Sequence, residues 1–417
     1  MFNTLFERPV ALGRQKSTPL AAERRRYLRH LTDQGMARPT VRLTAEYLVA
    51  IVERLRLGSA TRKKITDPMI ERQALLWSRR HFPKNITRPD GSRRRFLHQA
   101  RRWFRFMGWL KPRPRQVTRF SHTIDAFSSY MRDEQGLSTN TIRGRIDHLH
   151  DFLLRINGPR RSLLAITVQD VDRMLTSKFT LERYCRATIQ AHACILRAFF
   201  RFAERNGWCR EGLAAAIQSP RVYTGSSVPF GPSWKDVHRL LTTTNGNRAS
   251  NIRDRAVILL LSVYGLRAGE VVQLRLDDFD WQGERIKIRR PKQRKAQEFP
   301  LVRSVGDAVL RYLQQARPAS KQREVFVTCR PPYRPLRTGT LWPVVARRLR
   351  ALNVKLPHHG PHCLRHACAT HLLNEGLSLK EIGDHLGHVQ SDTTRIYAKV
   401  DFKHLREVGR IDLHGLV

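Results

Sequence analysis

The hydrophobic positions between residues 139 and 156 recur at the spacing of a helix. Counting from residue 142, apolar side chains stand at i, i+4, i+7, i+10 and i+11, namely Ile142, Ile146, Leu149, Phe152 and Leu153. This spacing predicts an amphipathic helix with one buried stripe. Arg143, Arg145 and His148 fall off the stripe, so the exposed side of the helix is expected to be positively charged.

A similar pattern occurs earlier in the chain. The stretch QGMARPTVR at 34–42 resembles QGLSTNTIR at 135–143, and the same offset of 101 residues relates Ile65 to Ile166. Further on, WFRFMGW resembles FFRFAERNGW with a small gap. We interpret these matches as a duplication of an all-helical unit of about 100 residues. Chance similarity between arginine-rich helices is the alternative.

Two stretches rich in proline and in basic or small residues, KPRPRQ and SPRVYTGSSVPFGPS, divide the chain into three segments. A length of 417 residues agrees with two or three domains. The expected division is a helical basic domain at 1–116, a helical domain at 117–218, a linker at 219–233, a third domain at 234–400 and a tail at 401–417.

The third segment has a mixed pattern. The run DRAVILLLSVYGL predicts a buried helix that breaks at Gly265, after which a second helix can start. In ERIKIRRPKQRKAQEFPLV, Ile286 and Ile288 alternate with polar residues before a basic turn and a second apolar run, which is typical of a β-hairpin. The predicted fold class is therefore mainly α, with a small β-hairpin or sheet in the third domain.

The charge of the chain points to a polyanionic partner. It holds 77 Lys and Arg against 35 Asp and Glu, a net charge of +42, and positions 1–117 contain 28 basic and 8 acidic residues. So large a surplus favours nucleic acid over a merely solvated basic face. Neither helical segment has the Cys/His spacing of a zinc finger, so helices and loops should make the contacts, with Thr141, Arg143 and Arg145 as candidates.

Cysteine usage and hydropathy indicate a reduced, cytoplasmic protein. The six cysteines show no paired spacing, and no signal-peptide pattern opens the chain. No run approaches the roughly 20 apolar residues needed to span a bilayer. We therefore expect no membrane association and a cytoplasmic location, which together with the nucleic-acid partner favoured by the charge implies association with the nucleoid.

Two basic features of the third segment suit phosphate binding. Arg267 lies in YGLRAGE between two apolar stretches, and the planar fork of an arginine matches two phosphate oxygens. An ion pair with Glu270 accounts for this arginine equally well. In the turn RPKQRKAQ, Arg294 and Lys295 are expected to touch backbone phosphates, and the spacing alone does not choose between Lys292 and Lys295 for a lysine that enters a groove.

The stretch HGPHCLRHACATHLLNEG predicts a helix with Pro361 as its first residue and Gly376 as its stop signal. His362 and Arg365 stand three residues apart, so both project from one face at the N-terminal end, where a phosphate is favoured. An imidazole that can move protons near neutral pH thus stands beside a fixed charge. The buried stripe is predicted to be Leu364, Cys368 and Leu372.

A zinc site competes for the same stretch, because it is dense in His358, His362, Cys363, His366, Cys368 and His371. No CxxC pair exists, however, and His362 with His366 lacks the glutamate of HExxH. We therefore expect no metal.

The last feature is DHLGHVQSDTTRIYAKV. Before it, LSLKEI supplies Ser378 and Glu381 as a capping box, and Gly387 ends the short helix. His388 is thereby set just beyond a helix end, and Tyr397 follows nine residues later. A tyrosine near a C-terminus is usually a packing residue, and as a nucleophile it needs a base and an electropositive pocket. This segment supplies both.

The order of these motifs, from residue 117 to 400, resembles the tyrosine recombinases, also called the phage integrase family. The quoted residues that carry the resemblance are YGLRAGE, a hairpin lysine followed by FPL, HCLRHACATHLL, LGH and the final tyrosine. The resemblance implies an enzyme that cleaves and rejoins DNA strands as a site-specific recombinase or integrase. The setting it favours is integration, excision or transposition of a mobile element.

The resemblance also implies roles for individual residues. Arg267 and Arg365 would grip the non-bridging oxygens of the scissile phosphate, and His388 would hydrogen-bond to it. Tyr397 would attack to form a 3′-phosphotyrosine, with His362 helping to take its proton.

The alignment through FPL favours Lys292 over Lys295 as the group that protonates the leaving 5′ oxygen. The covalent intermediate keeps the energy of the phosphodiester bond, so rejoining needs no ATP, metal or other cofactor. This agrees with the lack of a GxxxxGK[ST] motif in the sequence.

In members of the family, a helical core-binding domain and the catalytic domain form a C-shaped clamp around double-stranded DNA. Four such protomers exchange strands through a Holliday junction. By this resemblance, residues 117–218 are the core-binding domain with its SAM-like helices. The first 116 residues depart from the usual arm-binding domain, and we expect them to be a second core-binding-like module. The tail at 401–417 is expected to pack on a neighbouring protomer.

Other functions stay open at this point. A type IB topoisomerase has much the same active-site residues, and a Xer-like resolvase of chromosome dimers would share the whole motif order. A catalytically silent DNA-binding regulator is a third alternative, which the complete residue set disfavours.

Overall fold

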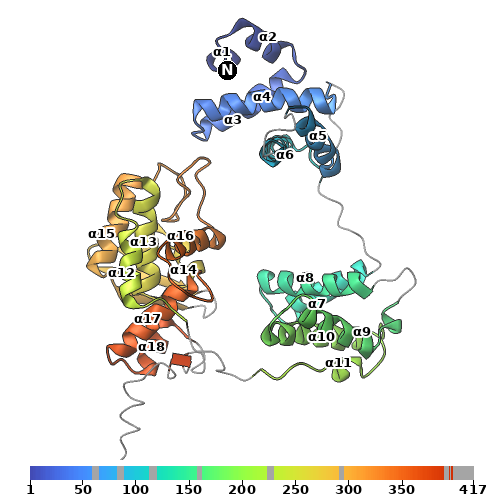
Figure 1. Ribbon diagram of the computed structural model, residues 1–417, viewed down its shortest axis with the longest axis vertical. Coiled ribbons are helices and arrows are strands. Elements are labelled where there is room, and N and C mark those ends of the chain that lie inside the picture. The colour runs from blue at the N-terminus through green and yellow to red at the C-terminus, as the bar shows by residue number, and fades with distance from the viewer. Residues whose placement is uncertain are drawn as a thin grey trace, which may run out of the picture. The chain divides into compact units, whose positions relative to one another are not determined.

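The computed structural model describes residues 1–58, 65–81, 89–111, 120–156, 162–222, 230–290 and 295–388, together with 394, 396 and 397. The chain divides into two compact units, one of them Arg113–Ser226 and the other Met1–Pro112 with Ser227–Val417. Buried apolar side chains cluster separately within residues 2–104, 120–217 and 237–397, so three segments are described one by one (Figure 1). Within the described residues, no helix combines the length and apolar character needed to cross a membrane.

In the described residues of the first segment the regular structure is helical, apart from one bridge between Ile65 and Leu110. Trp103 and Phe104 are fully buried near its end and anchor its core. Between its third and fourth helices the chain turns at Gly35, whose φ of +78° strains any residue that has a β-carbon. The helices are α1 Phe2–Leu5, α2 Pro9–Ser17, α3 Ala21–Asp33, α4 Arg38–Leu55, α5 Asp67–His81 and α6 Pro89–Phe106.

The second segment is also helical. Thr167 and Asp170 form a reciprocal capping box that starts α9, and an aromatic cluster of Phe127, Phe199 and Phe202 lies between α7 and α10. Its helices are α7 Ser121–Asp133, α8 Thr139–Ile156, the 3-10 turn η1 Leu163–Ala165, α9 Val168–Thr180, α10 Arg186–Arg205 and α11 Leu213–Ala216.

The first and second segments share their order of helices. Helices α4 and α8 are both 18 residues long and begin 101 positions apart, as do α5 and α9. Gly136 has a positive φ, as Gly35 does. Core positions repeat at the same offset, because both members of each of these pairs are buried: Val41 and Ile142, Leu48 and Leu149, Ile51 and Phe152, Val52 and Leu153, Ile65 and Ile166, Ile70 and Val171.

The third segment surrounds helix α13, whose apolar residues are buried on several sides, as the unbroken run AVILLL predicts. Figure 1 shows α12 and α15 alongside it. The helices are α12 Trp234–Thr242, α13 Ala249–Val263, α14 Ala268–Gln273, the 3-10 turn η2 Leu276–Asp278, α15 Arg303–Arg311, the π-helical turn η3 Tyr312–Ala316, α16 Thr338–Ala351, α17 His362–Asn374 and α18 Leu379–Leu386.

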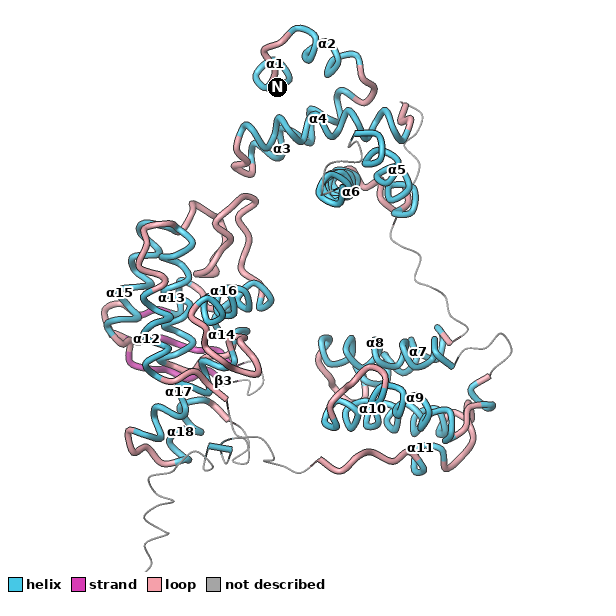
Figure 2. The backbone as a smooth tube through the Cα atoms, in the orientation of Figure 1, coloured by secondary structure: helices cyan, strands magenta, loops and turns pink. Residues whose placement is uncertain are grey.

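The predicted hairpin is confirmed and belongs to a three-stranded antiparallel sheet in the order β1-β2-β3 (Figure 2). The strands are β1 Phe279–Asp280, β2 Arg285–Arg290 and β3 Lys295–Pro300. Ile286 faces Phe299 and Ile288 faces Gln297 in the register of β2 with β3. Every second residue of β2 is buried, ending with Arg290, so the strand directs an arginine into the protein beside two isoleucines.

The aromatic cluster of the second segment gives a test of its core. Phe199 is fully buried and meets the ring of Phe127 edge-on at 5.4 Å. We expect Phe199→Ala to destabilise this segment by about 3–5 kcal/mol because it leaves a cavity. Urea unfolding, with hydrogen exchange read at the amides of α7 to α10, measures the loss.

The matched control is Phe179→Ala, since Phe179 is 49% exposed in the same segment. It should change the free energy of unfolding by no more than about 0.5 kcal/mol. Equal effects of the two substitutions would contradict the assigned core.

Candidate functional site

Helix α17 carries His362 and Arg365 as predicted, although it begins at His362 and Pro361 caps it from outside. The Arg365 side chain is only 1% exposed. Its guanidinium donates to the carbonyl oxygens of Gly265 at 2.6 Å and Leu386 at 2.8 Å. A buried arginine is therefore held by two backbone dipoles that come from other parts of the segment.

Arg267 stands just before α14 and is paired with Glu270. The Glu270 carboxylate accepts from the main-chain N–H of Arg267 at 2.8 Å and from its guanidinium at 2.8 Å. The other guanidinium nitrogen donates to the carbonyl of Gly387 at 3.2 Å. The ion pair left open by the sequence thus exists, but the side chain of Arg267 is still 33% exposed and has donors left for an anion.

The end of α18 brings these arginines together. Ser378 and Glu381 form the predicted capping box, and Gly387 ends the helix with a φ of +64°, as the sequence indicates. His388 follows directly, with its main-chain N–H bonded to the carbonyl of Gly383 at 2.9 Å. Its Nδ1 lies 2.7 Å from the Thr394 hydroxyl. The position of His388 is therefore fixed from both its main chain and its ring.

Arg290 is a central residue that the sequence argument missed. It is 1% exposed and donates from Nε to Gln297 at 2.8 Å, and from its two terminal nitrogens to the carbonyls of Leu386 at 2.5 Å and His385 at 2.9 Å. A longer contact of 3.5 Å reaches Glu270. The alternation of Ile286, Ile288 and Arg290 was the signal that could have found it, since all three positions share one face of a strand.

Tyr397 is 1% exposed, and its hydroxyl lies 2.9 Å from Nδ1 of His366. The ring of His362 packs edge-on against that of His366, with centroids 4.6 Å apart. The phenol thus meets His366, a residue that the sequence argument weighed only as a zinc ligand. His362 is linked to the tyrosine through the ring of His366. The signal available was the i, i+4 spacing of the two histidines on one helix.

Burial sets the protonation states in this site. It raises the pKa of Tyr397 to about 12, so the phenol is neutral at rest. Burial, and then the neighbouring positive charges, lower the pKa values of His366 and His388 to about 4. Burial together with Arg267 lowers the pKa of Arg365 to about 10. At neutral pH the imidazoles are therefore uncharged, while the guanidinium keeps its charge.

The remaining predicted residues are Lys292, Arg294, Lys295 and three residues of the second segment. Lys292 and Arg294 are outside the described residues, and of Lys295 only the main chain is described, as the first residue of β3. Thr141 bonds to the Ser138 hydroxyl at 2.9 Å. Arg143 is exposed, whereas Arg145 is half-buried with a guanidinium nitrogen 4.0 Å from the sulfur of Met131.

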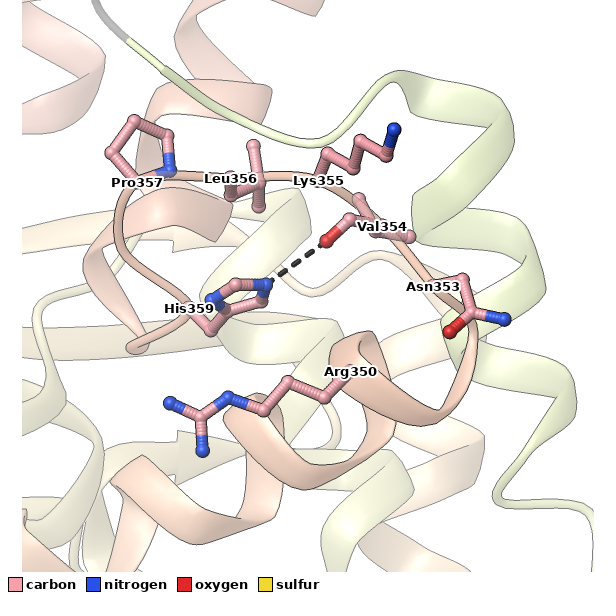
Figure 3. Close-up of a pocket in the computed structure, with 7 residues that line it drawn as sticks. All are labelled: Arg350, Asn353, Val354, Lys355, Leu356, Pro357 and His359. Atoms are coloured by element: carbon pink, nitrogen blue, oxygen red, sulfur yellow. Dashed lines mark hydrogen bonds between the residues drawn. The ribbon is translucent and has the colours of Figure 1, made fainter.

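A cavity of about 710 Å³ opens where α16 leads into the segment before α17 (Figure 3). None of the five predicted catalytic residues that the structure describes lines it, and Nε2 of His359 lies 2.9 Å from the Val354 carbonyl oxygen across it. Arg350 at its edge lies over the ring of Trp342. Among the described residues, no group of three or more His, Cys, Asp or Glu is placed to hold a metal ion.

Comparison with known proteins agrees with this geometry. The sequence profile of the Phage integrase family matches residues 233–404, and that of the Phage integrase N-terminal SAM-like domain matches 124–207. The "Putative integrase/recombinase y4rA" of Sinorhizobium fredii is 37% identical over 285 residues, which cover 68% of this chain and 69% of that protein. Tyrosine recombinase XerC of Alcanivorax borkumensis is 32% identical, over 69% of this chain and 92% of its own.

Among solved structures, the XerH site-specific recombinase bound to palindromic difH substrate has the same fold. It aligns with a TM-score of 0.53 and 16% sequence identity, over 82% of this chain and 94% of that one. The sequence identity to y4rA, over more than two thirds of both proteins, decides the assignment. The chain belongs to the phage integrase family, the tyrosine recombinases.

Proposed function

We propose that this chain is a site-specific DNA recombinase that cleaves and rejoins strands through a 3′-phosphotyrosine on Tyr397. One observation carries the proposal: the buried Tyr397 hydroxyl is hydrogen-bonded to the helix that holds Arg365, in a chain that belongs to the tyrosine recombinases. An attack on phosphorus needs a nucleophile, a base and fixed positive charge. This segment supplies them as a phenol, a neutral imidazole and guanidiniums.

The two arginines bind the non-bridging oxygens of the scissile phosphate. Each cation that is fixed in advance can lower the barrier by a few kcal/mol (about 3 for one well-placed donor), because negative charge grows in the pentavalent transition state. His388 adds a neutral imidazole whose Nδ1 lies 2.7 Å from the Thr394 hydroxyl. We assign it the tautomer in which that hydroxyl donates to Nδ1, which leaves the Nε2 proton for a phosphate oxygen.

The covalent step exchanges one ester bond for another. A bond forms between the Tyr397 oxygen and phosphorus while the bond from phosphorus to the 5′ oxygen breaks. The phenol proton passes to Nδ1 of His366, which is neutral and in hydrogen-bonding contact. Lys292 is our candidate for the general acid that protonates the 5′ oxygen, and attack by that hydroxyl in reverse rejoins the strand.

The DNA contacts extend over both helical segments. We assign residues 117–218 to a core-binding domain that closes on double-stranded DNA with the catalytic domain at 234–400, as a clamp. The repeated helix order and buried positions support a second module of the same kind at 1–116. In this proposal four protomers join two DNA sites and exchange strands through a Holliday junction. The tail at 401–417 packs on a neighbouring protomer. The favoured biological setting is the movement of a mobile element.

Tyr397→Phe removes the attacking oxygen and leaves the packing almost unchanged. With nicked DNA of a candidate site, the unaltered chain should form a covalent adduct that survives denaturation, whereas the variant should form none while binding the DNA within about 3-fold of normal. Gel electrophoresis after denaturation measures the adduct. An adduct formed by the variant would remove Tyr397 as the nucleophile.

His366→Phe keeps an aromatic ring against Tyr397 but removes the proton acceptor. We expect adduct formation to slow by about 100-fold or more, which is typical for the loss of a general base. Because the pKa of His366 is lowered to about 4, the imidazole should accept a proton down to about pH 5. On the acid limb of the pH profile, the rate of adduct formation should therefore decline only below about pH 5, and not near pH 6.5, the pKa of a free imidazole.

The same variant should lose that acid limb, because the group that titrates is absent. His371→Phe is the matched control, since His371 lies on the same helix and stacks on Trp234 with ring centroids 3.9 Å apart. Its rate should stay within about 2-fold of normal. An unaltered rate in His366→Phe, or a limb near pH 6.5, would rule out His366 as the base.

The repeat predicts equivalent DNA contacts in the two helical segments. Arg42 and Arg143 are exposed at the offset of 101 residues. Arg143→Glu and Arg42→Glu should each weaken DNA binding and lessen its salt dependence by about one phosphate contact. Footprinting of the full chain should show each variant losing protection at a different stretch of the site. Unchanged protection with Arg42→Glu would count against DNA contact by the first segment.

A further inference from the structure

Arg290 joins three parts of the third segment that are distant in sequence. It ends β2, bonds to Gln297 across the hairpin, reaches Glu270 of α14, and donates to the last carbonyls of α18. Four of its five N–H donors can be accounted for in this way. No other residue type has a rigid fork that could reach these three directions from one buried position.

Two of these partners also hold the arginines that we assign to phosphate binding. Glu270 accepts from Arg290 and from Arg267 through the same oxygen, Oε1. The carbonyl of Leu386 accepts from Arg290 at 2.5 Å and from Arg365 at 2.8 Å. Arg290 therefore shares one hydrogen-bond acceptor with Arg267 and another with Arg365.

Gly387 leaves the space that this arrangement needs. A β-carbon added there would collide with the guanidinium of Arg290, and the φ of +64° disfavours such a residue in any case. The glycine that ends α18, next to His388, therefore leaves room for the guanidinium of Arg290. The same helix end sets the carbonyl of Gly387 toward Arg267.

We propose that Arg290 is a positioning residue for strand cleavage: by fixing Glu270 and the end of α18 it sets Arg267 and Arg365 for the scissile phosphate. Its hydrogen bonds separate it from the phosphate-binding pair: within the described residues four of its five N–H donors meet protein acceptors, whereas Arg365 donates twice. The inference rests on the function proposed above for Arg267, Arg365 and Tyr397. It goes beyond that function in giving a task to a residue outside the catalytic set.

The test compares Arg290→Met with the unaltered chain on two substrates. On normal nicked site DNA, adduct formation should slow by about 100-fold, the loss expected when catalytic groups shift by about 1 Å, while DNA affinity stays within about 3-fold. On DNA with a methylphosphonate at the scissile position, the relative loss should shrink below about 10-fold. That substrate lacks one negative oxygen, so misplaced arginines matter less.

Arg285→Met is the matched control, since Arg285 opens the same strand and its side chain is 66% exposed. It should react within about 2-fold of normal on both substrates. Arg290→Lys keeps the charge without the fork and should stay at least about 10-fold slow. An equal loss on both substrates, or a parallel loss of DNA affinity, would overturn the positioning role and leave Arg290 as a structural residue only.

Hydrogen exchange tests the inference without relying on activity. Arg290→Met should expose the amides of Arg267 and His388, which are bonded to Glu270 and to the carbonyl of Gly383, while amides in the core of α13 stay protected. Protection of both amides in the variant would overturn the inference even if no adduct could be detected. If the unaltered chain forms no adduct but the two amides do open, the proposed function fails and the positioning contact stands.

Discussion

The carbonyl end of α18 is the interaction on which the rest of the site depends. A helix leaves its last carbonyls without partners and carries negative charge there. In this chain those carbonyls, from His385, Leu386 and Gly387, accept hydrogen bonds from Arg290, Arg365 and Arg267. The helix end and the arginines satisfy each other, so three guanidiniums from separate stretches of sequence meet within a few residues of His388.

The same arrangement leaves positive charge unbalanced. Two of the three guanidiniums, those of Arg267 and Arg290, pair with the buried carboxylate of Glu270, and the helix end offsets roughly half of one further charge. Buried charges without full compensation cost stability, and catalytic sites are where such a cost is retained. The surplus suits a phosphodiester whose negative charge increases during reaction. The ion pair of Arg267 with Glu270 is therefore compatible with the phosphate binding that we propose for this arginine.

Local chemistry explains what the sequence could predict. The capping box at Ser378, the stop at Gly387 and the hairpin depend on neighbouring residues alone, and all are found in the structure. Arg290 and the contact of His366 with Tyr397 depend on packing between segments 31 to 96 residues apart. Arg290 stood beside a basic turn, which favoured an exposed position, although the period of the strand indicated burial. His366 lies in a histidine-rich stretch, a pattern that suggests a metal ligand more readily than a base for a distant tyrosine.

The contact of Tyr397 also bears on which active site the tyrosine serves. Its hydroxyl is buried within its own chain, against the helix that carries Arg365. A neutral phenol with a pKa of about 12 does not attack phosphorus unaided, which is why the proposed reaction has His366 take its proton as the phosphate arrives. Releasing the tyrosine to a neighbouring protomer would instead give up a hydrogen bond worth about 1 kcal/mol and the burial of an aromatic ring. Attack within the same chain keeps the ring buried, and this difference favours the proposal that Tyr397 acts in its own active site.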